Sequence, residues 1–314
     1  MSGAPIEGSR MRNTVTTQIL LLALSTSPAF AQTTQPVTTN LFGDDKIRLI
    51  VRADDFGFSH ASNMALERLL NEGVLTAASV IVNTGWLDET VEILKRHPNV
   101  SVGVHVCLNS EWTPYKWGPV LPAKEVPSLV DEWGHFFGTR AALMANKPNM
   151  DEVEREIRAQ VDLALRKGLK ISYLDHHMGA AVTTPQMRER FVKVAKEYGL
   201  GISRWYGEMQ GPVVYNVEPA RKTEFLVTEL EKLTKPGLYL IVCHTLIKTP
   251  EVEVLKDLNA GGPKNMADHR QAECDMLCSP RLKQVIKDKG IELVGYDTLR
   301  DKFVNRMQQP PEAR

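Results

Sequence analysis

Short apolar runs alternate with longer amphipathic segments along most of the chain, a pattern typical of βα units around a parallel sheet. The apolar runs predict seven strands: Ile47–Ala53, Ala78–Val82, Val100–Leu108, Ile171–Leu174, Gly201–Arg204, Leu238–Cys243 and Ile291–Val294. Helical spacing between them is clearest at Ala61–Glu72, Leu87–His97, Met150–Lys167, Pro185–Tyr198, Ala220–Leu233 and Ser279–Lys289. Six or seven such units in one run predict an α/β fold, a closed or nearly closed (β/α) barrel.

A doubly wound open sheet is the alternative fold. Its Gly-rich phosphate loop after the first strand is absent from the sequence, which favours a barrel that is distorted or seven-stranded. The alternation is interrupted from Pro119 to Lys147, and we interpret this stretch as a loop or lid. We therefore expect a single barrel domain at residues 46–306 and a tail at residues 307–314.

The N-terminal segment predicts an export signal. The apolar stretch Ile19–Leu24 follows a basic start, and Ala29-Phe30-Ala31 has the small-x-small pattern of a cleavage site. The stretch is shorter than the roughly 20 residues that cross a bilayer, and a buried or frayed helix is the alternative. We expect a signal peptide at residues 1–31, cleavage near Ala31, a flexible lead-in at residues 32–45, and a periplasmic or extracellular mature protein.

Net charge limits the kinds of molecule that the protein is expected to bind, and the cysteines indicate whether disulfides or a zinc knuckle are expected. The 38 basic and 38 acidic residues give zero net charge, which argues against strong binding of nucleic acid and favours a neutral or modestly polar substrate. Four cysteines are present, and neither their spacing nor their apolar surroundings predict a zinc knuckle or a disulfide framework: Cys107, Cys243, Cys274 and Cys278.

Polar residues gather where the predicted strands end, which is where a βα barrel carries its catalytic groups. Each has a structural alternative, such as a helix cap for an aspartate or a hydrogen-bonded core role for a histidine. Carboxylates and neutral imidazoles together suit zinc and neighbouring metals. Because these residues belong to different strands, their coincidence predicts one metal site: Asp54, Asp55, His105, Asp175, His176, His177 and His244.

The order of these motifs resembles a known family. Ala53-Asp54-Asp55-Phe56-Gly57-Phe58-Ser59 is similar to the opening motif of the YdjC-like carbohydrate deacetylases, which include chitooligosaccharide deacetylases and share a layout with NodB-type polysaccharide deacetylases. Val102–Asn109, Leu174–Gly179 and Asp268–Glu273 resemble later motifs, over about residues 47–303. The resemblance implies a NodB-like barrel that removes an N-acetyl group from an acetylated amino sugar or oligosaccharide.

The resemblance also implies residue roles. A divalent ion, zinc or magnesium in the first instance, would be held by Asp55, His105 and His177, with Asp54 as the catalytic base. His244 would protonate the leaving amine or stabilise the transition state. The family has a serine where this chain has His176, so His176 stays a second candidate ligand, proton donor or substrate contact, although spacing favours His177.

Further residues and functions stay open at this point. Arg204 is a candidate to orient Asp54 or to bind substrate, and Trp112, with Trp86 and Trp205, to stack on a sugar; each also fits an ordinary packing or surface role. Other functions are a metal-dependent phosphoesterase or sugar isomerase, or an exported sugar-binding protein without catalysis. The strand ends offer few acids for the two metals that a phosphoesterase often uses. A sugar-binding protein without catalysis would not need a base beside the metal.

Overall fold

The structure, a computed structural model, describes residues 41–259 and 261–310. The predicted signal peptide, the cleavage site near Ala31 and most of the lead-in lie outside the described residues. In the described part, no helix combines the length and the apolar character that crossing a membrane requires.

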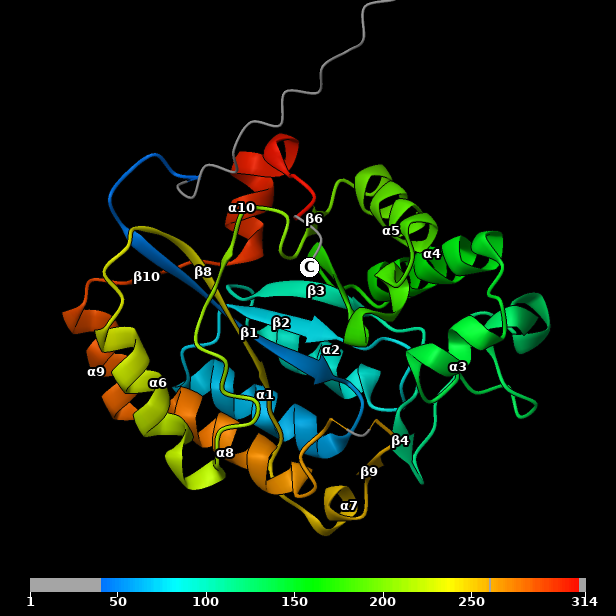
Figure 1. Cartoon of the computed structure of the whole chain (residues 1–314), viewed down its shortest axis with the longest axis horizontal. Helices are drawn as coiled ribbons and strands as arrows, with labels where there is room; N and C mark the ends of the chain where they lie inside the picture. Colours follow the sequence, from blue (N-terminus) through cyan, green and yellow to red (C-terminus); the bar gives the residue numbers. More distant parts are fainter. Residues whose placement is uncertain (1–40, 260, 311–314) are drawn as a thin grey trace, which may run out of the picture. The chain divides into compact units, whose positions relative to one another are not determined.

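Seven parallel strands follow one another across one sheet in the order β6-β5-β3-β2-β1-β8-β7 (Figure 1). Their bounds are β1 Ile47–Phe56, β2 Ala77–Val80, β3 Ser101–Val106, β5 Ile171–His176, β6 Gly201–Ile202, β7 Met209–Gln210 and β8 Gly237–His244. β10 (Glu292–Leu293) pairs with the start of β1. The end strands β6 and β7 are joined by residues 203–208 without pairing in the described sheet, so the sheet curls into an incomplete barrel. The predicted α/β barrel, distorted and nearly closed, is confirmed.

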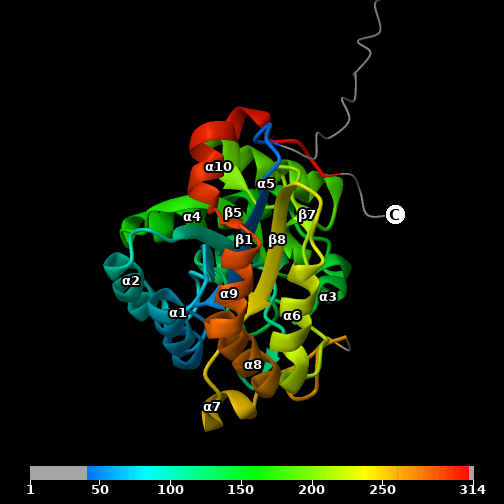
Figure 2. The same ribbon diagram turned by 90° about the vertical axis from the view of Figure 1, so that its left-hand side faces the viewer.

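Most helices cover the outer face of the sheet, whereas α10 packs on the inner side, where its Tyr296 and Leu299 join strand residues such as Ile50 (Figures 1 and 2). α6, α8 and α9 pack together beside β8, α4 packs on α5, and α10 lies against β3, β5 and β6. Their bounds are α1 His60–Glu72, α2 Leu87–Arg96, α4 Met150–Arg166, α5 Pro185–Glu197, α6 Lys222–Glu231, α8 Met266–Cys278, α9 Pro280–Asp288 and α10 Tyr296–Phe303. The sequence predicts six of these closely. It misses α10, and it marks the region of α8 only through the motif Asp268–Glu273.

The segment between β3 and α4 is irregular, as the loop interpretation of residues 119–147 expects. It holds two single 3-10 turns, at Ala123–Glu125 and Pro127–Leu129, and the short helix α3 (Arg140–Ala145). At the start of this segment, β4 (Trp112–Thr113) pairs antiparallel with β9 (Lys256–Asp257), which follows the short α7 (Pro250–Glu253). This small ribbon lies beside the carboxyl ends of the strands.

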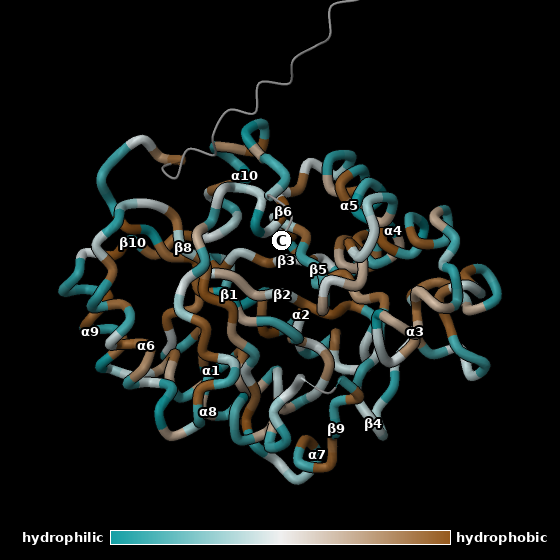
Figure 3. The backbone as a smooth tube through the Cα atoms, in the orientation of Figure 1, coloured by the Kyte–Doolittle hydropathy of each residue, from teal (hydrophilic) through white to brown (hydrophobic). Residues whose placement is uncertain are grey.

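Apolar side chains of the strands and of the inward helix faces form the core. Figure 3, which colours the backbone by hydropathy, shows hydrophobic residues in brown along the strands. A second apolar cluster joins Leu41 and Leu238 with Tyr173, Tyr206 and Tyr296. Leu41 is buried although it belongs to the predicted lead-in. At the other end, the Gln308 amide in the predicted tail donates to the Trp205 carbonyl over 2.9 Å. Packing therefore extends a few residues beyond the predicted bounds of 46 and 306.

Candidate metal centre

β1 ends in a kink that turns two adjacent acids towards one cavity. Neighbouring residues of a regular strand point to opposite faces of the sheet. Here the pairing with β2 shifts register between Ala53 and Phe56, and Asp55 has a left-handed φ of 68°. Such a conformation costs a non-glycine residue of order 1–3 kcal/mol and is found mainly at functional sites. The kink lets Asp54 and Asp55 line the same cavity.

The turn after the kink is held by hydrogen bonds into α1. The Gly57 amide donates to Asn63 Oδ1 at 3.0 Å, and Ser59 caps α1 with its hydroxyl. Gly57 has φ 93°, and a side chain at this position would approach the Ile81 carbonyl to 2.9 Å. Glycine is therefore required here. The turn fixes the direction in which Asp55 leaves β1.

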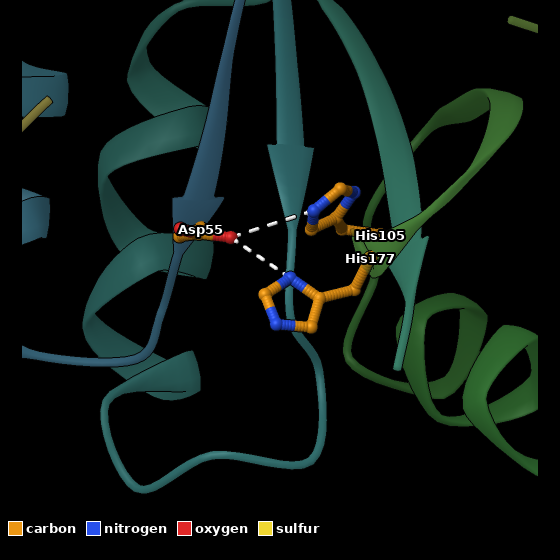
Figure 4. Close-up of side chains that lie close together, drawn as sticks. All are labelled: Asp55, His105 and His177. Atoms are coloured by element: carbon orange, nitrogen blue, oxygen red, sulfur yellow. Dashed lines mark ion pairs between the residues drawn. The ribbon is translucent and has the colours of Figure 1, made fainter. Parts of the chain in front are cut away.

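Asp55, His105 and His177 come together at this strand end (Figure 4). Asp55 Oδ1 lies 3.4 Å from His105 Nε2 and 3.2 Å from His177 Nδ1, and all three side chains are buried. One ligand atom from each lies within 4.8 Å of the others. Atoms bound to one zinc ion at about 2.0–2.2 Å are separated by such distances. The three residues that the sequence predicts as ligands therefore share one site.

A carboxylate holds the outward nitrogen of each imidazole. His105 Nδ1 lies 2.9 Å from Asp175 Oδ2, and His177 Nε2 lies 2.8 Å from Glu111 Oε2. Burial alone would lower the pKa of His105, but Asp54 and Asp175 raise it to about 9. Carboxylates in this outer position orient ligand histidines in metal sites.

Arg52 binds the second acid of the β1 pair. Its Nε and one terminal nitrogen contact the two oxygens of Asp54 at 2.7 Å each, the same terminal nitrogen lies 2.9 Å from Asp175 Oδ2, and the other donates to Ser203 at 2.6 Å. Despite the burial, Asp175 and Asp54 hold the pKa of Arg52 well above its ordinary value. Arg52 rather than Arg204 therefore orients Asp54, and this corrects that part of the Arg204 prediction. Arg204 lines the cavity and contacts Gln210.

Arg270 of α8 holds the other oxygen of Asp55. Its terminal nitrogen lies 2.9 Å from Asp55 Oδ2, and its guanidinium lies 5.2 Å from the centre of the Trp112 ring. Burial would raise the pKa of Asp55, but Arg270 and the two histidines hold it well below its ordinary value. Asp55 is therefore ionised, with Oδ1 left to face the imidazoles.

The cavity in front of these groups has a volume of about 230 Å³. Five acidic side chains and three arginines line it, which leaves two negative charges in excess when the histidines are neutral. Of the three candidate sugar-stacking tryptophans, Trp112 lines the cavity. Trp86, 41% exposed, contacts the His60 ring instead, and Trp205 packs on the core.

His176 and His244 line the same cavity. The Nδ1 atom of each is buried and has no hydrogen-bond partner among the described residues. Burial lowers the pKa of both rings, so that both are neutral at pH 7. The backbone of His244 is fixed by Glu273, whose Oε2 accepts its amide at 2.6 Å, and its ring lies 5.4 Å from that of Tyr215.

The model of the family described as YdjC-like protein matches residues 48–288 of the chain. The chain belongs to the YdjC-like family. It is 30% identical over 268 residues to a carbohydrate deacetylase of Brevibacillus brevis, covering 81% of this chain and all of the relative. A carbohydrate deacetylase of Thermus thermophilus is 30% identical over 264 residues, covering 76% and 89%. A solved structure from Enterococcus faecalis, described as a putative cellobiose-phosphate cleavage protein, shares the fold with a TM-score of 0.67 and 24% identity, covering 81% and 99%.

In this YdjC-like protein the two neighbouring histidines at the end of β5, His176 and His177, point to different partners. His177 reaches Asp55, whereas the His176 ring lies 6.1 Å from Phe191. Sequence reasoning missed the contacts of Glu111, Arg52 and Arg270. For Arg52 a signal exists, because it lies two residues before Asp54 in a strand and so shares its face.

Proposed function

We propose that this YdjC-like protein is a metal-dependent carbohydrate deacetylase that hydrolyses the N-acetyl group of an acetylated amino sugar or oligosaccharide. The main support for the proposal is a buried cluster of three side chains, Asp55, His105 and His177, beside a second acid, Asp54. The relatives named carbohydrate deacetylase support the choice of substrate class.

The residues of the site fit a divalent ion. Asp55 Oδ1 is buried and makes no hydrogen bond with the described residues, although an ionised carboxylate requires partners in the interior. The cavity has two negative charges in excess, and the facing donors are one oxygen and two imidazole nitrogens. We propose Asp55, His105 and His177 as ligands of one ion, zinc or magnesium. Bound there, the ion would polarise the acetyl carbonyl and lower the pKa of a water molecule.

Asp54 is the proposed general base. Arg52 donates hydrogen bonds to both oxygens of its carboxylate. The Oδ2 atom of Asp54 lies 4.0 Å from His105 Nε2, next to the proposed ligands. An attacking water at the ligand cluster is therefore within reach of a fixed carboxylate. Asp54 accepts the proton of this water as the oxygen attacks the acetyl carbon.

His244 is the proposed partner of the departing nitrogen. It is buried, lines the cavity, and offers a ring nitrogen, Nδ1, that has no hydrogen-bond partner in the described part of the chain. As a neutral imidazole it carries one N–H, which can hydrogen-bond to the transition state or pass a proton to the leaving amine. His176 offers the same chemistry from the β5 side, and Trp112 and Arg204 supply an aromatic face and a cation for the sugar.

Two alternatives find less support in the site. A two-metal phosphoesterase would need a second group of ligands, and the candidate among the described residues is Asp54, His105 and Asp175. The guanidinium of Arg52 already contacts both of these carboxylates, which leaves a second cation little charge to bind. A sugar-binding protein without catalysis would have no use for a base held in this way.

The export signal at residues 1–31 remains part of the proposal. It is supported by the apolar stretch and the Ala29-Phe30-Ala31 pattern alone. Cell fractionation followed by N-terminal sequencing tests it: the mature protein should be periplasmic or extracellular and begin near Gln32. An intact Met1 in the cytoplasmic fraction would contradict export.

Acetate release tests the enzymatic proposal. The purified protein, loaded with zinc or magnesium, is incubated with N-acetylglucosamine, with chitooligosaccharides and, in separate reactions, with phosphate esters. The release of acetate and the release of phosphate are both measured. We expect acetate from at least one substrate, and loss by orders of magnitude in Asp55→Ala. Turnover that persists undiminished in Asp55→Ala, or phosphate release in place of acetate release, would refute it.

A further inference from the structure

We propose that Glu111 is a positioning residue that presents Nδ1 of His177, rather than Nε2, to the metal ion. The inference rests on the proposed metal site and adds to it which ring nitrogen binds. Glu111 follows β3 in the loop that leads to β4, and its side chain is 2% exposed.

The contacts of Glu111 determine which His177 nitrogen is free. Glu111 Oε2 lies 2.8 Å from His177 Nε2, and it also accepts from Asn109 Nδ2 at 3.2 Å. An ionised carboxylate only accepts hydrogen bonds, so Nε2 of the ring carries the proton. The lone pair of the neutral ring then lies on Nδ1, which is 3.2 Å from Asp55 Oδ1.

His105 shows the opposite arrangement in the same site. Its Nδ1 contacts Asp175 at 2.9 Å, and its Nε2 faces Asp55 Oδ1 at 3.4 Å. The two rings meet edge to face, with centres 5.0 Å apart and planes at 81°. Each imidazole therefore has a carboxylate beside its outward nitrogen, and these nitrogens differ: Nδ1 in His105 and Nε2 in His177. Of the two contacts, the one between Glu111 and His177 is a hydrogen bond, so Glu111 fixes the His177 ring.

Glu111 has no comparable task in holding the fold. Its loop is linked to the β9 segment by the β4–β9 pairing and by its own backbone carbonyl, which accepts the Leu258 amide at 2.9 Å. Neither link depends on the Glu111 side chain. A buried carboxylate is unfavourable unless its partners compensate for the lost water. Those partners are His177 and Asn109, and His177 is a proposed ligand. The side chain is therefore best explained by the orientation of His177.

Nuclear magnetic resonance of the full chain, labelled with ¹⁵N-histidine and loaded with zinc, tests which nitrogen binds. Long-range ¹H–¹⁵N correlations distinguish a protonated from a metal-bound ring nitrogen. We expect zinc to shift the ¹⁵N signals of two histidine rings: His105, bound through Nε2, and His177, bound through Nδ1. The Nε2–H of His177 should be protected from exchange by Glu111. Two rings both bound through Nε2 would overturn the proposal.

Zinc affinity of Glu111 variants provides a second readout, which is independent of activity. Loss of such an outer carboxylate typically weakens metal binding 10–100-fold. We expect this in Glu111→Ala, a smaller loss in Glu111→Gln, and none in Glu132→Ala, an exposed acid used as the control. Unchanged affinity in both Glu111 variants would overturn the role. Should Glu111→Ala not fold, Glu111→Gln and the wild-type spectrum decide. A wild-type protein that binds no zinc, magnesium or cobalt would instead refute the metal site itself.

Discussion

Replacing Arg52 by methionine removes one guanidinium that two buried carboxylates share. Arg52, Asp54 and Asp175 are each 4% exposed or less, and three contacts of 2.7–2.9 Å join the guanidinium to the two acids. Methionine fills much of the same space without a charge. The variant therefore leaves two ionised groups in the interior without their main partner.

The expected loss of stability follows from the cost of an unpaired buried charge. Removing one partner of a buried ion pair typically costs about 3–5 kcal/mol, and here two carboxylates lose the same partner. We expect the upper end of that range. A domain has about 5–15 kcal/mol of unfolding free energy in total, so Arg52→Met should be folded at low temperature but markedly easier to unfold.

Catalysis should fall as well, for a separate reason. Without the guanidinium, repulsion between Asp54 and Asp175 favours a shared proton, and a protonated Asp54 is no longer a base. General-base catalysis contributes about 10²–10⁴ in rate, so acetate release near neutral pH should fall by up to that factor. The activity that remains should increase with pH as the proton is removed.

Urea unfolding and acetate release, measured on four proteins, separate the two effects. Arg52→Lys keeps a charge and should lose less stability than Arg52→Met. Arg52→Met combined with Asp54→Asn should regain part of the lost stability, because a neutral amide needs no cation, yet it should stay inactive. If Arg52→Met unfolds at the wild-type urea concentration, or if Asp54→Asn destabilises it further, the account of the buried charges is wrong.

Three other predictions concern separate features. Asp55→Asn should lose measurable metal in elemental analysis and acetate release by orders of magnitude while circular dichroism stays native; full metal content in this variant would contradict its role as a ligand. Burial raises the pKa of Glu156 from 4.5 to about 6, so the folded state binds a proton at this side chain more tightly than the unfolded state does. The resulting stabilisation is fully present below pH 4.5 and is lost as the pH rises through 6. Relative to Glu156→Gln, the wild-type unfolding free energy should thus fall by about 2 kcal/mol between pH 4 and pH 7; parallel curves would refute this. The structure has four free, buried cysteines: Cys107, Cys243, Cys274 and Cys278. Without reductant, a thiol reagent should therefore react with four thiols in the denatured protein and with few in the native protein. Fewer than four reactive thiols after denaturation would indicate a disulfide.

Most of the parallel strands are predictable because each contains a short run of apolar residues. β1, β3, β5 and β8 are almost wholly buried, and that burial is what the runs of Val, Ile and Leu record. Polar residues at the ends of such strands contrast strongly with their surroundings, which is why Asp55, His105 and His177 were found. β7 has only two residues and no such run, so it was missed.

The outer part of the site was less predictable because its residues lie in elements without clear periodicity. α8 is buried on most of its surface, including His269, Arg270 and Glu273, so the polar stripe that normally marks a surface helix is missing. Glu111 belongs to an irregular loop, where spacing carries no information about direction. Its partner lies 66 residues away, and only the fold brings the two together.

The distribution of the arginines supports the proposal that a metal ion, rather than a further side chain, completes the site. Arg52 takes both oxygens of Asp54, and Arg270 takes Oδ2 of Asp55. The facing oxygen, Asp55 Oδ1, is left between two imidazoles, and no arginine of the described residues contacts it. When no ion is bound, protons take its place, since the nearby carboxylates raise the pKa of His105 to about 9 in spite of burial. A divalent cation balances the two negative charges in excess and leaves the rings neutral, which is the state in which imidazole binds metal.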